Sequence, residues 1–109
     1  MRYALPALLL LAAPAAAQDA LAVTYLCDGD AVLQVAYLNP ADGPSLAVVA
    51  YAGRLVPMQA GPTGSGVRYL AFDRASGLLW HNKGDEGFLA TDDGTQETVV
   101  LGNCRRAGA

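Results

Sequence analysis

Two polar residues stand in glycine-rich turns, where a hydroxyl and a cation could act together. Ser65 lies in the turn at residues 64–66, and Lys83 directly precedes Gly84. A Ser–Lys nucleophile requires a lysine that is desolvated and has lost its charge. Both turns are polar and flexible, so we expect Lys83 to keep its proton. The pair is therefore predicted to offer a hydrogen-bonding hydroxyl and an ammonium ion rather than a catalytic dyad.

A hydrophobic hairpin is predicted to bring the two turns to one end of a sheet. Its strands are residues 69–72 and 78–80, and residues 75–77 form the turn between them. Ser65 enters the first strand and Lys83 leaves the second. Because an antiparallel hairpin fixes how its strands pair, both residues are expected at the end opposite the turn.

The other residues that could take part in catalysis do not form a recognisable catalytic set. His81 is the single histidine and stands beside Trp80 in a strand, so no Ser-His-Asp set can be assembled. The acidic pairs at residues 85–86 and 92–93 fall in turns, where solvated carboxylates are expected and weak calcium binding is the alternative. Two distant cysteines and one histidine do not form a metal site. The sequence thus indicates no enzyme, no metal and no cofactor.

The remaining chain has the pattern of short strands separated by turn residues. Apolar residues alternate in segments 22–27 and 31–38, which places Val23 and Tyr25 on one face of the first segment. About eight strands at regular spacing predict an all-β fold, either an antiparallel sandwich or a small barrel filled by its own side chains. Pro57 lies within one strand, and it is expected at an edge or a bulge unless its nitrogen points away from a partner.

The first 17 residues have the pattern of a cleavable signal peptide. Arg2 gives a basic start, a Leu- and Ala-rich run follows, and residues 15–17 provide a cleavage signal, with the cut expected after Ala17. The apolar run is shorter than the roughly 20 residues that a membrane span needs. No cysteine in this region could carry a lipid. We therefore expect a periplasmic protein without a membrane anchor, in which residues 18–109 form one domain.

The predicted mature chain is acidic. Without Arg2 it has six basic residues against ten acidic ones, which gives a net charge of −4. Nucleic-acid binding would require a basic face, so this class of partner is excluded. A mild negative charge keeps an exported protein soluble, and it also favours encounter with a basic partner.

Cys27 and Cys104 are the two cysteines of the chain. An even number of cysteines in a small exported domain predicts a disulfide. This bond would tie the first strand to the last. In the chain-entropy model, closing so long a loop stabilises the fold by about 4–5 kcal/mol at most.

Several short motifs occur in an order that resembles a known family. They are Tyr25-x-Cys27, Ser65-Gly66-x-x-Tyr69 and Trp80-x-x-Lys83-Gly84, followed by Cys104. Together they resemble the periplasmic and membrane-bound inhibitors of C-type lysozyme over most of residues 25–104. The resemblance implies a small eight-stranded antiparallel β-barrel. Asn82 and Leu79 depart from the pattern, where threonine and an aromatic residue are more usual.

The resemblance also implies a site and a partner. In the family, the serine and the lysine of these motifs enter the lysozyme active-site cleft, which gives that role to Ser65 and Lys83. Two aromatic residues would anchor the hairpin by packing, and two glycines would let the backbone turn tightly beside the partner: Tyr69, Trp80, Gly66 and Gly84. A C-type lysozyme is thus the expected protein partner.

Two other functions remain open on sequence grounds. A small β-barrel can hold a small apolar ligand, and the apolar strand faces favour this possibility. An envelope barrel could also act as an interaction module that binds a cell-wall or outer-membrane component. The oligomeric state is left open as well.

Overall fold

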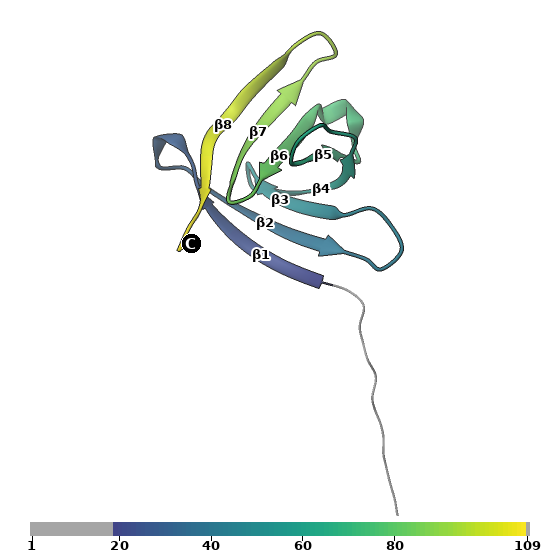
Figure 1. Cartoon of the computed structure of the whole chain (residues 1–109). Helices are drawn as coiled ribbons and strands as arrows, with labels where there is room; N and C mark the ends of the chain where they lie inside the picture. Colours follow the sequence, from purple (N-terminus) through teal and green to yellow (C-terminus); the bar gives the residue numbers. More distant parts are fainter. Residues whose placement is uncertain (1–18, 109) are drawn as a thin grey trace, which may run out of the picture.

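The computed structural model describes residues 19–108, so the expected signal peptide lies outside the described part. Eight antiparallel strands follow one another around a closed barrel, which confirms the predicted fold (Figure 1). Within the described residues, no helix is long and apolar enough to cross a membrane. The elements are β1 (Asp19–Leu26), η2 (Asp28–Asp30, a 3-10 turn), β2 (Val32–Asn39), β3 (Leu46–Tyr51), β4 (Arg54–Gly61), β5 (Val67–Ala71), η3 (Arg74–Ser76, a 3-10 turn), β6 (Leu78–Lys83), β7 (Glu86–Asp92) and β8 (Glu97–Arg106).

The inward-facing side chains of the strands fill the barrel interior. Every second residue of a strand faces the same side of a sheet, and the predicted alternation is confirmed by the burial of Val23 and Tyr25 in β1. Eight strands enclose a space that side chains can fill completely. The eight largest fully buried side chains come from six different strands and include Trp80, Leu33, Met58, Leu79 and Leu89.

Pro57 is accommodated inside the closed barrel. It lies within β4 in regular register with Val48 of β3, so the strand is neither an edge nor a bulge. The Pro57 carbonyl accepts a hydrogen bond from the N–H of Phe72 at 3.0 Å. Because the nitrogen and carbonyl of one strand residue point the same way, the proline nitrogen faces the point where β5 has just ended at Ala71. The sequence predicted either an edge or bulge at Pro57 or a nitrogen without a partner. The structure shows the second arrangement, because the Pro57 nitrogen has no hydrogen-bonding partner within β5.

The barrel is closed by a short seam between its first and last strands. β1 and β8 meet over two residue pairs, Tyr25–Arg106 and Leu26–Arg105. Away from this seam the two strands diverge, as the purple-blue and yellow arrows in Figure 1 show. Cys27 and Cys104 form the predicted disulfide beside the seam, joining residues 77 positions apart. A covalent bond therefore reinforces the shortest strand pairing of the barrel.

Candidate functional site

The hairpin of β5 and β6 holds the two turn residues at one end of the barrel wall. Val67 of β5 pairs with Asn82 of β6, so Ser65 and Lys83 lie just outside this last pair. The turn η3 joins the two strands at the opposite end. This arrangement confirms the predicted placement of the two residues. Both are exposed to solvent.

Gly66 allows the two turns to approach each other closely. Its φ is +70°, a left-handed conformation that side chains rarely adopt. A Cβ atom added to Gly66 would lie 2.6 Å from the carbonyl oxygen of Asn82 and 3.0 Å from Cβ of Lys83. Gly84 also has a positive φ, +62°, but its surroundings are open. A glycine is thus required at position 66 both for the left-handed backbone and because a side chain has no room there. At position 84 only the left-handed backbone requires a glycine.

His81 connects the Ser65 turn to β6. Its Nε2 atom lies 3.0 Å from the carbonyl oxygen of Ser65. A carbonyl oxygen can only accept a hydrogen bond, so the imidazole is the donor. The ring of Phe88 in β7 packs edge-on against the imidazole, with the ring centroids 5.2 Å apart. The predicted half-exposed strand histidine is confirmed, and the structure in addition places its ring in contact with the candidate site.

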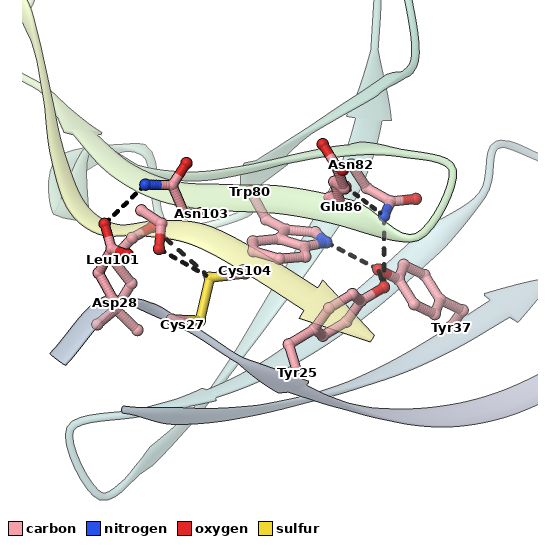
Figure 2. Close-up of a disulfide and its surroundings, with 11 residues drawn as sticks. Tyr25, Cys27, Asp28, Tyr37, Trp80, Asn82, Glu86, Leu101, Asn103 and Cys104 are labelled. Atoms are coloured by element: carbon pink, nitrogen blue, oxygen red, sulfur yellow. Dashed lines mark hydrogen bonds between the residues drawn. A yellow bond between two sulfur atoms is a disulfide. The ribbon is translucent and has the colours of Figure 1, made fainter. Parts of the chain in front are cut away.

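Asn82 organises the Lys83 turn from the other face of β6. Its side-chain Nδ2 atom lies 3.1 Å from the carbonyl oxygen of Glu86 and 3.3 Å from that of Gly84. The same atom is 3.3 Å from the Tyr25 hydroxyl in the barrel interior (Figure 2). An amide group has two hydrogens, so these three acceptors share them. The residue that departs from the family motif therefore ties the lysine turn to the core.

A buried hydrogen-bond chain supports the turn from within. The indole N–H of Trp80 donates to the Tyr37 hydroxyl at 2.8 Å, and the hydroxyls of Tyr37 and Tyr25 are 2.7 Å apart (Figure 2). Burial raises the pKa of Tyr37 far above its ordinary value, and burial also raises the pKa of Tyr69. The hydroxyls of Tyr37 and Tyr69 therefore stay protonated. These hydrogen bonds fix β6 relative to β1 and β2, because Trp80, Tyr25 and Tyr37 come from these three strands.

The two aromatic residues of the motifs belong to the interior. Trp80 is 0% exposed and Tyr69 is 4% exposed. Their side chains can influence a partner only through the hairpin that they hold in place. The sequence did not point to the role of Tyr37, although one signal was available. Tyr37 alternates with apolar inward-facing residues, and a buried tyrosine hydroxyl needs a hydrogen-bond partner.

The carboxylates nearest to Lys83 in sequence are paired with arginines of β8. Glu86 forms an ion pair with Arg105 at 3.0 Å, and Asp85 lies 3.9 Å from Arg106. Among the described residues, no carboxylate lies within ion-pairing distance of Lys83. The lysine is also exposed, which leaves its charge solvated. Its ammonium group is therefore available to an external carboxylate.

The second acidic pair, Asp92 and Asp93, stabilises the turn in which it lies. The Asp93 carboxylate accepts hydrogen bonds from the N–H groups of Gln96 and Thr95, and these bonds lower its pKa to about 2. The Asp92 carboxylate accepts a hydrogen bond from the N–H of Gly94. Both carboxylates thus hold the β7–β8 turn, as expected of turn residues. Within the described part of the chain, no three potential metal ligands lie together.

Comparison with known proteins identifies the family. The family model for the membrane-bound lysozyme-inhibitor of c-type lysozyme matches residues 25–98, more than half of the chain. A search of curated proteins gave no match. Two solved structures are similar along nearly their whole length, and they share 27% and 29% of aligned residues with this chain.

The first is PliC, the periplasmic lysozyme inhibitor of C-type lysozyme from Salmonella typhimurium. It has 27% identity and a TM-score of 0.73, and the match covers 82% of this chain and 99% of PliC. The second is Pseudomonas aeruginosa MliC, whose structure was solved in complex with hen egg white lysozyme. It has 29% identity and a TM-score of 0.64, with 92% of this chain and 96% of MliC covered. The motifs, the barrel and the family match agree, and the chain belongs to the family of membrane-bound lysozyme inhibitors of C-type lysozyme.

Proposed function

We propose that this protein inhibits C-type lysozymes by inserting its Ser65 and Lys83 turns into the active-site cleft. The observation that carries the proposal is the pair of exposed turns that the β5–β6 hairpin holds at one end of the barrel wall. The structure of Pseudomonas MliC with hen egg white lysozyme supports this class of partner. A rigid barrel with two polar turns suits entry into a concave site, since pre-ordered turns lose little conformational entropy on binding.

The chemistry of the two side chains fits such a cleft. A lysozyme hydrolyses its glycan with two carboxyl groups that flank the scissile bond. The Lys83 ammonium would pair with an ionised carboxylate there, and the Ser65 hydroxyl would hydrogen-bond to the same pair of groups. Charge-assisted hydrogen bonds are about twice as strong as neutral ones, and exclusion of water strengthens them further. Both turns would occupy the place of the substrate, so inhibition would be competitive.

The remaining motif residues would support the two contacts. Tyr69 and Trp80 would hold the hairpin by packing inside the barrel, where both are buried. Gly66 and Gly84 would let the backbone turn sharply beside the partner, and both have positive φ angles. In this proposal the four residues set the shape of the tip, and the contacts themselves come from Ser65 and Lys83.

We also propose that the protein acts in the periplasm and acts by binding rather than catalysis. The location rests on the expected signal peptide and on the Salmonella relative, which is named a periplasmic inhibitor. The absence of catalysis rests on the exposure of Lys83, because a lysine activates a serine only when it is desolvated. A small apolar ligand in the barrel gains no support, because side chains such as Trp80 and Met58 fill the interior.

The direct test is lysis of bacterial cell walls by a C-type lysozyme in the presence of the purified protein. Dose-dependent inhibition that more substrate overcomes is the expected result, and unchanged lysis at micromolar protein would contradict the proposal. Lysozymes of this class are commonly basic, so the acidic inhibitor should associate at a rate that falls as salt rises. Stopped-flow association at low salt and at about 0.5 M salt measures this dependence, since the screening length at that concentration is only a few ångströms.

Replacing Gly66 by alanine is expected to weaken inhibition by at least about tenfold and to lower the unfolding free energy by about 1–3 kcal/mol. The new methyl group would meet the Asn82 carbonyl at 2.6 Å and push the Ser65 turn away from Lys83. Inhibition constants and urea denaturation measure the two effects. Gly64→Ala in the same loop is the matched control, because its Cβ would meet nothing within 4 Å. Equal behaviour of the two variants would show that the close approach of the turns is unimportant.

A further inference from the structure

The Ser65 turn has a specific attachment to the barrel that the family motif does not contain. His81 occupies one of the two open positions between Trp80 and Lys83. Its Nε2 atom donates to the Ser65 carbonyl oxygen at 3.0 Å. The same carbonyl accepts a hydrogen bond from the Thr63 hydroxyl at 3.2 Å, which lies within the loop itself. Among the described residues, the His81 contact is the side-chain hydrogen bond that joins residues 62–66 to the strands.

The position of the imidazole depends on two neighbouring residues, Phe88 and Gly66. The edge-on contact with Phe88 of β7 fixes the ring on the outer face of β6. The absent side chain of Gly66 leaves room for the ring, because a Cβ atom there would lie 3.1 Å from Nε2. A fixed donor thus faces the backbone of the residue whose hydroxyl is expected to enter the lysozyme cleft.

The arrangement links the spacing of the two contact groups to one strand. His81 and Lys83 are two residues apart in β6, so they extend from the same face of the strand. His81 holds the Ser65 backbone, and Lys83 carries the ammonium group. Through this histidine, the Ser65 hydroxyl takes its position relative to the Lys83 charge from β6 rather than from a flexible loop.

We propose that His81 is a positioning residue that orders the Ser65 turn for lysozyme binding by donating a hydrogen bond from Nε2 to the Ser65 carbonyl. This inference rests on the proposed function, in which Ser65 enters the cleft. A hydrogen bond of this kind contributes about 0.7–1.4 kcal/mol, which corresponds to roughly a three- to tenfold change in affinity. His81 contacts the backbone of Ser65 and not its hydroxyl, so the hydroxyl remains available to the partner.

Two substitutions separate the hydrogen bond from the packing of the ring. His81→Phe keeps a ring against Phe88 and removes the donor, whereas His81→Gln keeps an N–H donor at about the same reach and removes the ring. We expect His81→Phe to weaken inhibition roughly three- to tenfold and His81→Gln to stay within about twofold of the parent protein. Equal losses in both variants, or no loss in either, would overturn the proposal.

A measurement on the free protein tests the inference without lysozyme. Backbone order parameters from NMR relaxation should fall at Ser65 and Gly66 in His81→Phe, toward the values below about 0.6 that mark flexible segments, and should be kept in His81→Gln. If the parent protein fails to inhibit lysozyme while these order parameters respond as expected, the proposed function fails and the ordering role of His81 stands. Unchanged order parameters in His81→Phe would overturn that role whatever the inhibition assay shows.

A double-mutant cycle gives the last test. In a Ser65→Ala background the histidine has no hydroxyl left to position, so His81→Phe should cost clearly less there than in the parent protein. The Ser65→Ala substitution keeps the backbone carbonyl, so the His81 hydrogen bond itself persists. Strictly additive losses of affinity would show that the two residues act independently and would overturn the proposal.

Discussion

A Lys83→Met variant is expected to inhibit C-type lysozyme at least about 30-fold more weakly than the parent protein. Removing one partner of a desolvated, hydrogen-bonded charge pair costs about 2–5 kcal/mol of binding free energy, because the other charge is left buried and unpaired. Methionine keeps the apolar stem of the side chain and removes only the ammonium group. The inhibition constant from a cell-wall lysis assay, together with the dissociation rate from surface binding, measures the loss.

Arg54→Met is the matched control for this experiment. Arg54 is exposed at the start of β4, whereas the 62–66 loop follows the other end of that strand. Both substitutions remove one positive charge, so both change the net charge of the protein equally. We expect Arg54→Met to leave the inhibition constant within about threefold, and both variants to keep their stability within about 0.5 kcal/mol, as surface changes usually do. Equal losses of inhibition would mean that overall charge, and not Lys83, governs binding.

Replacing both cysteines by alanine is expected to lower the unfolding free energy by about 2–5 kcal/mol, the usual cost of removing a native disulfide from a small exported domain. The effect should be large here, because the bond stands beside a seam of only two residue pairs between β1 and β8. Urea denaturation of the Cys27→Ala, Cys104→Ala double variant measures it. Changing both residues together avoids a free thiol that could link two molecules.

Inhibition should survive in the double variant at temperatures well below its unfolding midpoint. The hairpin that carries the Ser65 and Lys83 turns is formed by pairing between β5 and β6, which do not contribute to the seam. A stability within about 1 kcal/mol of the parent protein would contradict the assigned role of the disulfide. Loss of inhibition in a variant that is still folded would show that the seam shapes the binding turns directly.

Much of the fold could be predicted because strand alternation is a local property of the sequence. The pattern around Val23 and Tyr25 identified the buried face of β1, and the structure buries both side chains. The number of strands and the disulfide followed from turn residues and cysteine count. The hydrogen bonds from Trp80 to Tyr37 and between Tyr37 and Tyr25 could not be predicted, because they join strands whose neighbourhood depends on how the barrel closes.

The candidate site also has a part that could be predicted from the sequence and a part that could not. A hairpin argument placed Ser65 and Lys83 at one end, since pairing within a hairpin needs only local sequence. The contacts of His81 and Asn82 were not foreseen. His81 reaches a carbonyl of a loop that adopts its path only with a left-handed glycine at position 66, and Asn82 reaches both the lysine turn and a tyrosine of β1. Such contacts depend on loop paths and on long-range packing, which residue patterns do not specify.

The seam between β1 and β8 also determines when the molecule can be completed. A chain is synthesised from its first residue onward, so β8 is the last strand to be completed. Until then Cys27 has no partner, and β1 shows an unpaired edge of the kind that promotes aggregation. A product cut short before Cys104 could neither close the barrel nor form the bond. Such a product would carry a free thiol and an open sheet. The disulfide can therefore form only after the last strand of the barrel has been made.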